Sequence, residues 1–164
     1  MMSETHPVHA QDRSEIRAQW HAMRSEYHQL VSSIPLADLR KPTLDTKWSI
    51  VDILTHMIQS LEQIPNEISV VRKGKNYLNL PIPVIGRINY VIVKLRAASQ
   101  TPQTLMAAYD RAFSAAIIAW DSVAEDEWEK GGHIFGEGYY TLTEIYLKGL
   151  HHFREHSDQI QRSL

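Results

Sequence analysis

Apolar residues recur at spacings of three and four along most of this chain, which is the pattern of amphipathic α-helices. The first such stretch runs from about residue 12 to residue 34, and the second begins near residue 50. A third runs from Thr101, a cap followed by proline, to about residue 123, and the last from residue 141 to residue 160. Four long amphipathic helices without a convincing strand predict an all-α bundle.

Capping residues mark where two of these helices begin. Thr141 is followed three residues later by Glu144, so each side chain can bond the backbone near the other, as in a capping box. Ser49 and Asp52 give the second helix a similar start. We expect Pro65 to end or kink that second helix, because proline removes a backbone donor and clashes with the preceding turn.

Two stretches lack a helical period and are predicted to be loops. Residues 72–83 contain prolines and asparagines and are expected to form a lid or pocket wall. Residues 124–140 contain four glycines and are expected to form a flexible loop just ahead of the last helix. The apolar segment 84–96 is predicted to be an extra short helix, with a strand as the competing prediction because of its β-branched residues.

Length and composition narrow the class of protein. A chain of 164 residues is long enough for one domain, predicted over residues 1–164, with a mobile arm over residues 1–10. Cysteine is absent, so disulfides, thiolate ligands and a thiol nucleophile are excluded, and histidine and carboxylates are the available metal ligands.

Neither the charge nor the hydropathy of the chain indicates a nucleic-acid or membrane partner. The net charge is -2 and basic residues are scattered among acidic ones, so no electrostatic footprint for nucleic acid is present. No basic and apolar leader and no apolar run of about 18 residues occur, so neither export nor membrane insertion is expected. We therefore expect a cytoplasmic protein with a small-molecule partner.

Histidines supply the candidate chemistry. His152 and His156 lie one turn apart toward the apolar face of the last helix, whereas His151 points toward water. Two imidazoles at this spacing can share one metal ion. The spacing alone is weak evidence, because random placement of this many histidines would give on average roughly 0.5 such pairs per chain. Buried histidines satisfied by hydrogen bonds are the alternative. A third ligand should border the core face of another long helix, and His56 meets that description.

Two segments resemble a known family. The stretches at 48–57 and 141–160 resemble the two signature segments of the DinB/YfiT-like superfamily of small four-helix-bundle metalloproteins. The first signature runs Trp-Ser, then Asp, then Leu-x-His. The second runs His, three residues, His, two residues, Gln-Ile. The matching residues are Trp48, Ser49, Asp52, Leu54 and His56 in the first segment, and His152, His156, Gln159 and Ile160 in the second.

The resemblance implies a fold and a metal site. The fold would be an up-down-down-up four-helix bundle with the extra short helix. The site would consist of His56, His152 and His156 holding Zn²⁺ or Ni²⁺ with open positions for water or substrate, which is typical of catalytic rather than structural zinc sites. Asp52 and Gln159 would orient the ligand rings.

The resemblance also implies an activity. Similar proteins are thiol-dependent S-transferases that use small thiols such as bacillithiol or mycothiol, and some others are metal-dependent hydrolases. We therefore expect an enzyme that acts on small electrophiles in detoxification or stress response. His133 and Glu137 are candidate catalytic residues for moving the proton, and Trp48 or Tyr77 would line the pocket.

Two alternatives from other classes stay open. The bundle could sequester a small molecule without turnover. It could also be a dimeric interaction module, because Met106, Ile117 and Ile118 widen the apolar surface of the helix at 101–123. A serine hydrolase and a P-loop are excluded by the lack of their motifs, and no Glu-x-x-His pair supports a di-metal carboxylate site.

Overall fold

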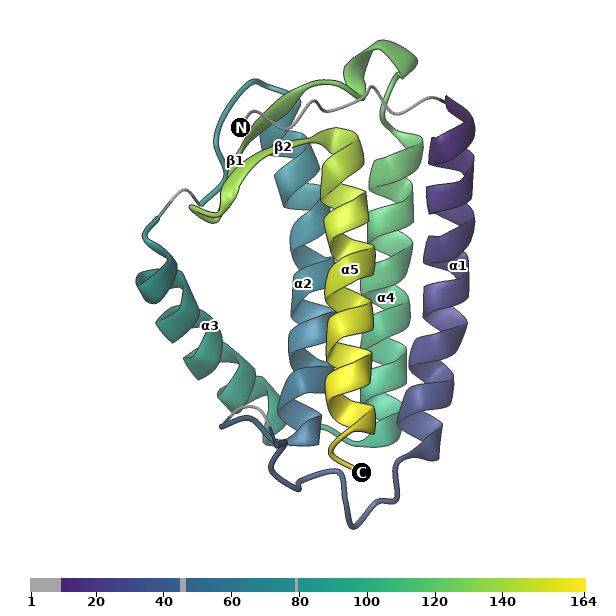
Figure 1. Cartoon of the computed structure of the whole chain (residues 1–164), viewed down its shortest axis with the longest axis vertical. Coiled ribbons are helices and arrows are strands. Elements are labelled where there is room, and N and C mark those ends of the chain that lie inside the picture. The colour runs from purple at the N-terminus through teal and green to yellow at the C-terminus, as the bar shows by residue number, and fades with distance from the viewer. Residues whose placement is uncertain (1–9, 45–46, 79) are drawn as a thin grey trace.

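Four long helices lie side by side, and a fifth diverges from them (Figure 1). The computed structural model describes residues 10–44, 47–78 and 80–164. In Figure 1, the first and last helices of the bundle run in one direction and the middle two in the other, which confirms the predicted bundle. The helices are α1 (Ala10–Ser33), α2 (Ile50–Val71), α3 (Ile82–Ala97), α4 (Pro102–Asp121) and α5 (Leu142–Gln161), with α3 the divergent one.

The predicted helix starts are present. Thr141 Oγ1 accepts from the Glu144 N–H at 3.2 Å, while the Glu144 carboxylate accepts from the Thr141 N–H at 2.7 Å. At the start of α2 the Asp52 carboxylate accepts from the Ser49 N–H at 2.8 Å. These bonds satisfy backbone donors that have no partner within the helix, so they fix the register of the two helices that carry the histidines.

Proline does not end α2. Pro65 was expected to end or kink the helix, with Gly74 as the outer limit, and the helix continues beyond Pro65 to Val71, within that limit. Ile68 and Val71 lie after the proline and are almost fully buried. Their burial against the bundle offsets the lost backbone hydrogen bond, because each buried aliphatic side chain contributes about 1.5–3 kcal/mol.

Large aromatic side chains fill the centre of the bundle. Trp20 donates its indole N–H to the Tyr146 carbonyl oxygen at 3.1 Å, and the Tyr27 ring stacks on Tyr109 with centroids 3.8 Å apart. Gly149 faces Trp20 so closely that a Cβ there would lie 2.7 Å from the Trp20 ring. The glycine on the apolar face of α5 therefore makes room for the tryptophan.

The glycine-rich segment contains a β-hairpin, where a flexible loop was predicted. Strands β1 (Gly131–Ile134) and β2 (Gly138–Thr141) pair antiparallel. Three residues lie between the paired Ile134 and Gly138, and the first two, Phe135 and Gly136, have positive φ angles of 54° and 69°, so the chain turns tightly enough for the Glu137 N–H to donate to the Ile134 carbonyl oxygen at 3.0 Å. Strands this short and rich in glycine leave no alternating pattern, so the prediction missed them.

Tyr77 holds the hairpin to the end of α2. Its N–H donates to the His133 carbonyl oxygen at 2.9 Å, and its carbonyl oxygen accepts from the Phe135 N–H at 3.0 Å. This backbone pairing ties the stretch between α2 and α3 to the segment that precedes α5. The two segments predicted as separate loops are thus parts of one structure.

Helix α3 confirms the helix predicted at 84–96, but it packs loosely. Among the described helices and strands it contacts α2 most, and only Val93 and Ala97 of its residues are buried. Its exposed large hydrophobic residues include Ile82, Val84, Ile88, Val91, Ile92 and Leu95. Helix α3 stands away from the bundle at its N-terminal end (Figure 1), and residues of α2, α3 and α5 line a cavity.

Some expectations are not decided by the fold. The mobile arm predicted over residues 1–10 lies outside the described residues except for residue 10, and the single domain over 1–164 stays a prediction. Ile118 is 70% exposed on α4, and the homodimer through that helix also stays a prediction. Within the described residues, no helix has the length and apolar character needed to cross a membrane.

Candidate metal centre

Three histidines from two distant segments meet at one point. His56 comes from α2, and His152 and His156 come from α5. The Nε2 atom of His152 lies 2.9 Å from that of His56 and 3.2 Å from that of His156. Ligand atoms of all three lie within 4.8 Å of one another, whereas His151 is exposed, as predicted.

Hydrogen bonding alone does not account for this geometry. One imidazole nitrogen carries either one proton or one in-plane lone pair, so His152 Nε2 cannot make full hydrogen bonds to both neighbours. Three nitrogens bound to one tetrahedral zinc at about 2.0–2.1 Å lie about 3.3 Å apart. The observed separations are close to that value, so the histidines fit a shared divalent cation.

The protonation states also suit a metal. Burial, together with the nearby His156, lowers the pKa of His56 to about 4. Burial lowers the pKa of His152 to about 2, with contributions from His56, His156 and Lys148. Both rings are therefore neutral near pH 7, which is the form of imidazole that binds metals.

Two amides contact the other nitrogens of these rings. Gln159 Oε1 lies 2.9 Å from His156 Nδ1 and accepts its proton, which leaves the His156 Nε2 lone pair facing the centre. The Asn89 side-chain amide lies 3.2 Å from His56 Nδ1. Gln159 thus occupies the orienting position predicted for it, while Asn89 reaches the site from α3.

Asp52 does not orient a ligand ring as expected, and Asn89, which the sequence analysis did not select, lies beside His56. The Asp52 carboxylate bonds Ser49 and Lys94, so it caps α2 and anchors α3 and does not orient a histidine ring. Asn89 was missed because its helix is remote in sequence from both histidine segments. The only available signal was a lone asparagine in an otherwise apolar stretch of α3.

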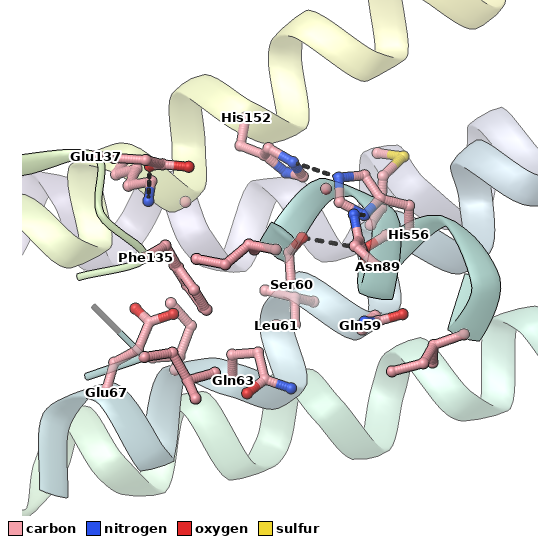
Figure 2. Close-up of a pocket in the computed structure, with 18 of the residues that line it drawn as sticks. His56, Gln59, Ser60, Leu61, Gln63, Glu67, Asn89, Phe135, Glu137 and His152 are labelled. Carbon is pink, nitrogen blue, oxygen red and sulfur yellow. Dashed lines mark hydrogen bonds and ion pairs between the residues drawn. The ribbon is translucent and has the colours of Figure 1, made fainter. Parts of the chain in front are cut away.

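His56 and His152 line a cavity of about 450 Å³, which His156 does not reach. Side chains from α2, α3, α5 and the hairpin line it, and most of them are apolar. Figure 2 shows His56 and His152 at one end and Glu67 and Glu137 toward the other. A mostly apolar pocket of this size with a few polar groups at its ends is typical of small-molecule sites.

A buried carboxyl group lies at the end far from the histidines. Glu67 is 4% exposed, and burial raises its pKa to about 7, with Glu137 raising and Lys148 lowering it. Lys148 forms an ion pair with Glu137. Sequence analysis did not select Glu67, although a glutamate between Ile64 and Ile68 on the apolar face of α2 was a signal.

The structure separates the two predicted catalytic residues. Glu137 lines the cavity, whereas His133 lies on the exposed side of β1 with its ring 5.6 Å from that of Tyr139. His133 is not among the residues that line the cavity. Both catalytic assignments stay predictions, and only Glu137 is placed where a substrate in the cavity would meet it.

The two predicted pocket-lining aromatics flank the cavity without lining it. The Trp48 ring packs against the His56 ring with centroids 4.8 Å apart. The Tyr77 hydroxyl donates to Gln63 Oε1 at 2.5 Å. Each therefore supports a residue that faces the cavity.

Two residues of the cavity wall have unusual backbone angles. Leu78 has φ of 43° and Phe135 has φ of 54°. Positive φ is uncommon for residues other than glycine and costs on the order of 1–3 kcal/mol, and such residues cluster at ligand sites. Both lie on the segments that Tyr77 joins, so this wall of the cavity is held in place by backbone pairing.

Comparisons with known proteins agree with this geometry. The sequence matches the DinB superfamily over residues 19–160. No curated protein matches it significantly. A mycothiol-dependent maleylpyruvate isomerase and a histidine-to-alanine mutant of that enzyme share its fold, each with a TM-score of 0.73 at 14% identity. Each alignment covers 89% of this chain but 59% of the isomerase, so this chain corresponds to part of that enzyme.

Proposed function

This chain belongs to the DinB superfamily, and from that premise we propose that it is a metal-dependent enzyme that transfers a small thiol to an electrophilic substrate. The observation that carries the proposal is the convergence of His56, His152 and His156, the first two of which line one end of an apolar cavity. A divalent ion held there, Zn²⁺ or Ni²⁺, would lower the pKa of a coordinated thiol or water and so supply a nucleophile near neutral pH.

The protein's own residues would hold and orient this centre. Three histidine ligands leave a coordination position open, which is typical of catalytic zinc sites. Gln159 fixes the His156 ring by accepting its Nδ1 proton, whereas the Asn89 amide nitrogen donates to His56 Nδ1, so Asn89 would orient His56 for a metal only with its amide oxygen turned to that nitrogen. The apolar lining would exclude water from the reacting groups.

The thiol would have to be a separate molecule. The chain contains no cysteine, so no side chain can supply the attacking sulfur. The structurally similar isomerase is mycothiol-dependent, which supports a low-molecular-weight thiol as the cosubstrate here. In the transfer, the thiolate sulfur would bond to the electrophilic carbon as that carbon's bond to a leaving group, or its π bond to a neighbouring atom, breaks. The thiol proton would pass to the group that receives the displaced electrons or to solvent. Neither predicted proton carrier contacts the histidines: Glu137 lines the other end of the cavity, and His133 does not line it.

Hydrolysis is the closest alternative within the same site. Water would take the place of the thiol, and no residue that lines the cavity distinguishes the two nucleophiles. A role in detoxification or stress response also stays a proposal, because the pocket fits small molecules in general. A protein that captures such a molecule without turnover is the alternative outside enzymes.

Metal content is the first test. Untagged protein, purified without a nickel column, should contain about one equivalent of zinc or nickel, and His56→Ala and His152→Ala should lose it. His151→Ala is the matched control, because this neighbouring histidine is exposed and should not change the metal content. A wild-type protein that binds no metal even after incubation with Zn²⁺ and Ni²⁺ would refute the proposal.

Turnover is the second test. Metal-loaded protein should accelerate consumption of a small thiol by 1-chloro-2,4-dinitrobenzene, and His152→Ala should abolish that acceleration. Mycothiol, bacillithiol, glutathione and free cysteine should be compared as thiols. Stoichiometric binding of the electrophile without product release would favour the sequestration alternative, and hydrolysis without thiol consumption would favour the hydrolase.

A further inference from the structure

The end of the cavity opposite the histidines contains a carboxylate without a partner. Glu67 is 4% exposed and forms no hydrogen bond or ion pair with any residue in the described part of the chain. It nevertheless lines the cavity, and Figure 2 shows it across the cavity from His152. An unpaired buried carboxylate costs several kcal/mol, so a folded protein seldom keeps one without a use.

The charged groups around Glu67 do not satisfy it. Lys148 of α5 forms its ion pair with Glu137 of the hairpin, and its ammonium also lies 5.2 Å from the ring centre of Phe135. The other titratable groups that face Glu67 are Tyr77 and Tyr146. The cluster thus has two carboxyl groups and one ammonium, and it has one negative charge in excess when both carboxyls are ionised.

Glu67 is too far from His56 to exchange a proton with a group bound to that ring. It lies eleven positions after His56 on α2, which corresponds to a rise of about 16 Å at about 1.5 Å per residue. Proton transfer needs hydrogen-bond contact or one bridging water. Glu67 therefore faces a different part of any ligand that fills the cavity.

We propose that Glu67, together with Glu137, binds a positively charged nitrogen group at the end of an elongated, otherwise apolar ligand. The group would be an ammonium, amidinium or guanidinium, and the rest of the ligand would extend along the apolar walls toward His152. Only the placement of the reacting end at the histidines rests on the proposed function.

The electrostatics favour a cation over an anion. A cation would neutralise the excess negative charge and give Glu67 the partner it lacks, and a guanidinium would do so with two parallel hydrogen bonds. A carboxylate ligand would meet two acidic groups, and its one attractive partner, Lys148, is already paired. Because burial raises the pKa of Glu67 to about 7, cation binding should also displace a proton.

Calorimetry with three matched probes tests this inference. Hexylguanidinium, hexanoate and 1-hexanol have the same apolar chain, and the guanidinium stays charged at all working pH values and is a poor metal ligand. Hexylguanidinium should bind at least tenfold more tightly than hexanoate at pH 8. Its affinity should rise about tenfold from pH 6 to pH 8, as the ionised fraction of Glu67 rises.

Two substitutions with opposite expected effects on hexylguanidinium affinity distinguish recognition of the positive charge from apolar packing of the hexyl chain. Glu67→Gln should weaken hexylguanidinium binding about tenfold at pH 8 and remove its pH dependence, whereas Glu155→Gln, an exposed site on α5, should change neither. Lys148→Met should strengthen hexylguanidinium binding severalfold, because it removes the competing ammonium. If Glu67→Gln does not fold, the direction in which Lys148→Met changes hexylguanidinium affinity still tests the proposed cation site.

The inference fails if hexanoate binds as tightly as hexylguanidinium, if neither binds, or if Lys148→Met weakens the guanidinium. The metal proposal is tested separately by repeating the titration with His152→Ala. Retained guanidinium affinity in that variant would show that the cation site is independent of the histidine centre. Loss of hexylguanidinium affinity in His152→Ala would refute the proposal that the cation site and the histidine centre are separate.

Discussion

At one end of the cavity, burial lowers the pKa values of His56 and His152, and at the other end it raises the pKa of Glu67. The physical cause is the same, because an apolar environment disfavours whichever form carries charge. The consequences differ. A neutral imidazole offers a lone pair to a metal cation, whereas a neutral carboxyl retains its proton until a positive group makes ionisation favourable. One apolar wall thus prepares two sites of different chemistry.

The largest expected effect concerns the histidine end. Saturating Zn²⁺ should stabilise the wild-type protein by about 3–4 kcal/mol at 100–1,000 times the dissociation constant, which raises Tm by roughly 10 °C. His156→Ala should lose this shift, and a chelator should reverse it in the wild type. Differential scanning fluorimetry measures it. Glu67→Gln, at the other end of the cavity, is the control and should keep the zinc-induced rise in Tm. Loss of that rise in Glu67→Gln would mean that the two ends of the cavity are not independent.

The next effect concerns the carboxyl end. The folded-state pKa of Glu67 is raised from 4.5 to about 7, so its folded form holds a proton that the unfolded chain releases, and wild-type stability falls as pH rises through this window. Glu67→Gln should therefore be about 2–3 kcal/mol more stable than wild type at pH 8, with no such gain at pH 4. Urea unfolding at both pH values measures this. An equal effect at pH 4 and pH 8 would contradict the raised pKa.

A smaller effect should come from the amide that orients His156. Gln159→Leu removes the acceptor of the His156 Nδ1 proton and should weaken zinc affinity about tenfold, the lower limit for such supporting contacts. Competition with a chromogenic chelator measures the affinity. Gln161→Leu, at an exposed position of the same helix, should have no effect. Unchanged affinity in Gln159→Leu would mean that packing alone orients the ring.

The smallest effect should come from Asn89. Asn89→Leu removes the amide whose oxygen, turned to His56 Nδ1, would accept the proton of the metal-bound ring, and it should weaken zinc affinity about threefold, as expected for one neutral bond on a half-buried residue. The same chelator competition measures it. Hexylguanidinium binding at the other end should not change. A loss much larger than tenfold would show that α3 positions His56 more strongly than this single bond indicates.

The long helices were predictable because their signals are local. The capping pair of Thr141 and Glu144, and the apolar spacing that follows, lie within one segment of sequence, and the structure has the helix where they predict it. Pro65 shows the limit of such reasoning. Its local effect is to break a helix, but the burial of Ile68 and Val71 beyond it comes from contacts with the rest of the bundle, which no local pattern contains.

The histidine end was predictable for a similar reason. The spacing of His152 and His156 places both rings on one helix face, and the segment around His56 carries a family signature. The carboxyl end has no such signature. Glu67, Glu137 and Lys148 come from three segments whose approach depends on the hairpin and on its pairing with Tyr77.

The sequence by itself determined the helices, their caps and the inward direction of the paired histidines, because each depends on interactions between residues a few positions apart. Only the tertiary structure decided that α3 stands away from the bundle, that a hairpin closes the cavity, and that Glu67 is buried without a partner. These features depend on contacts between residues far apart in the chain, whose energies no local pattern of apolar and polar residues records.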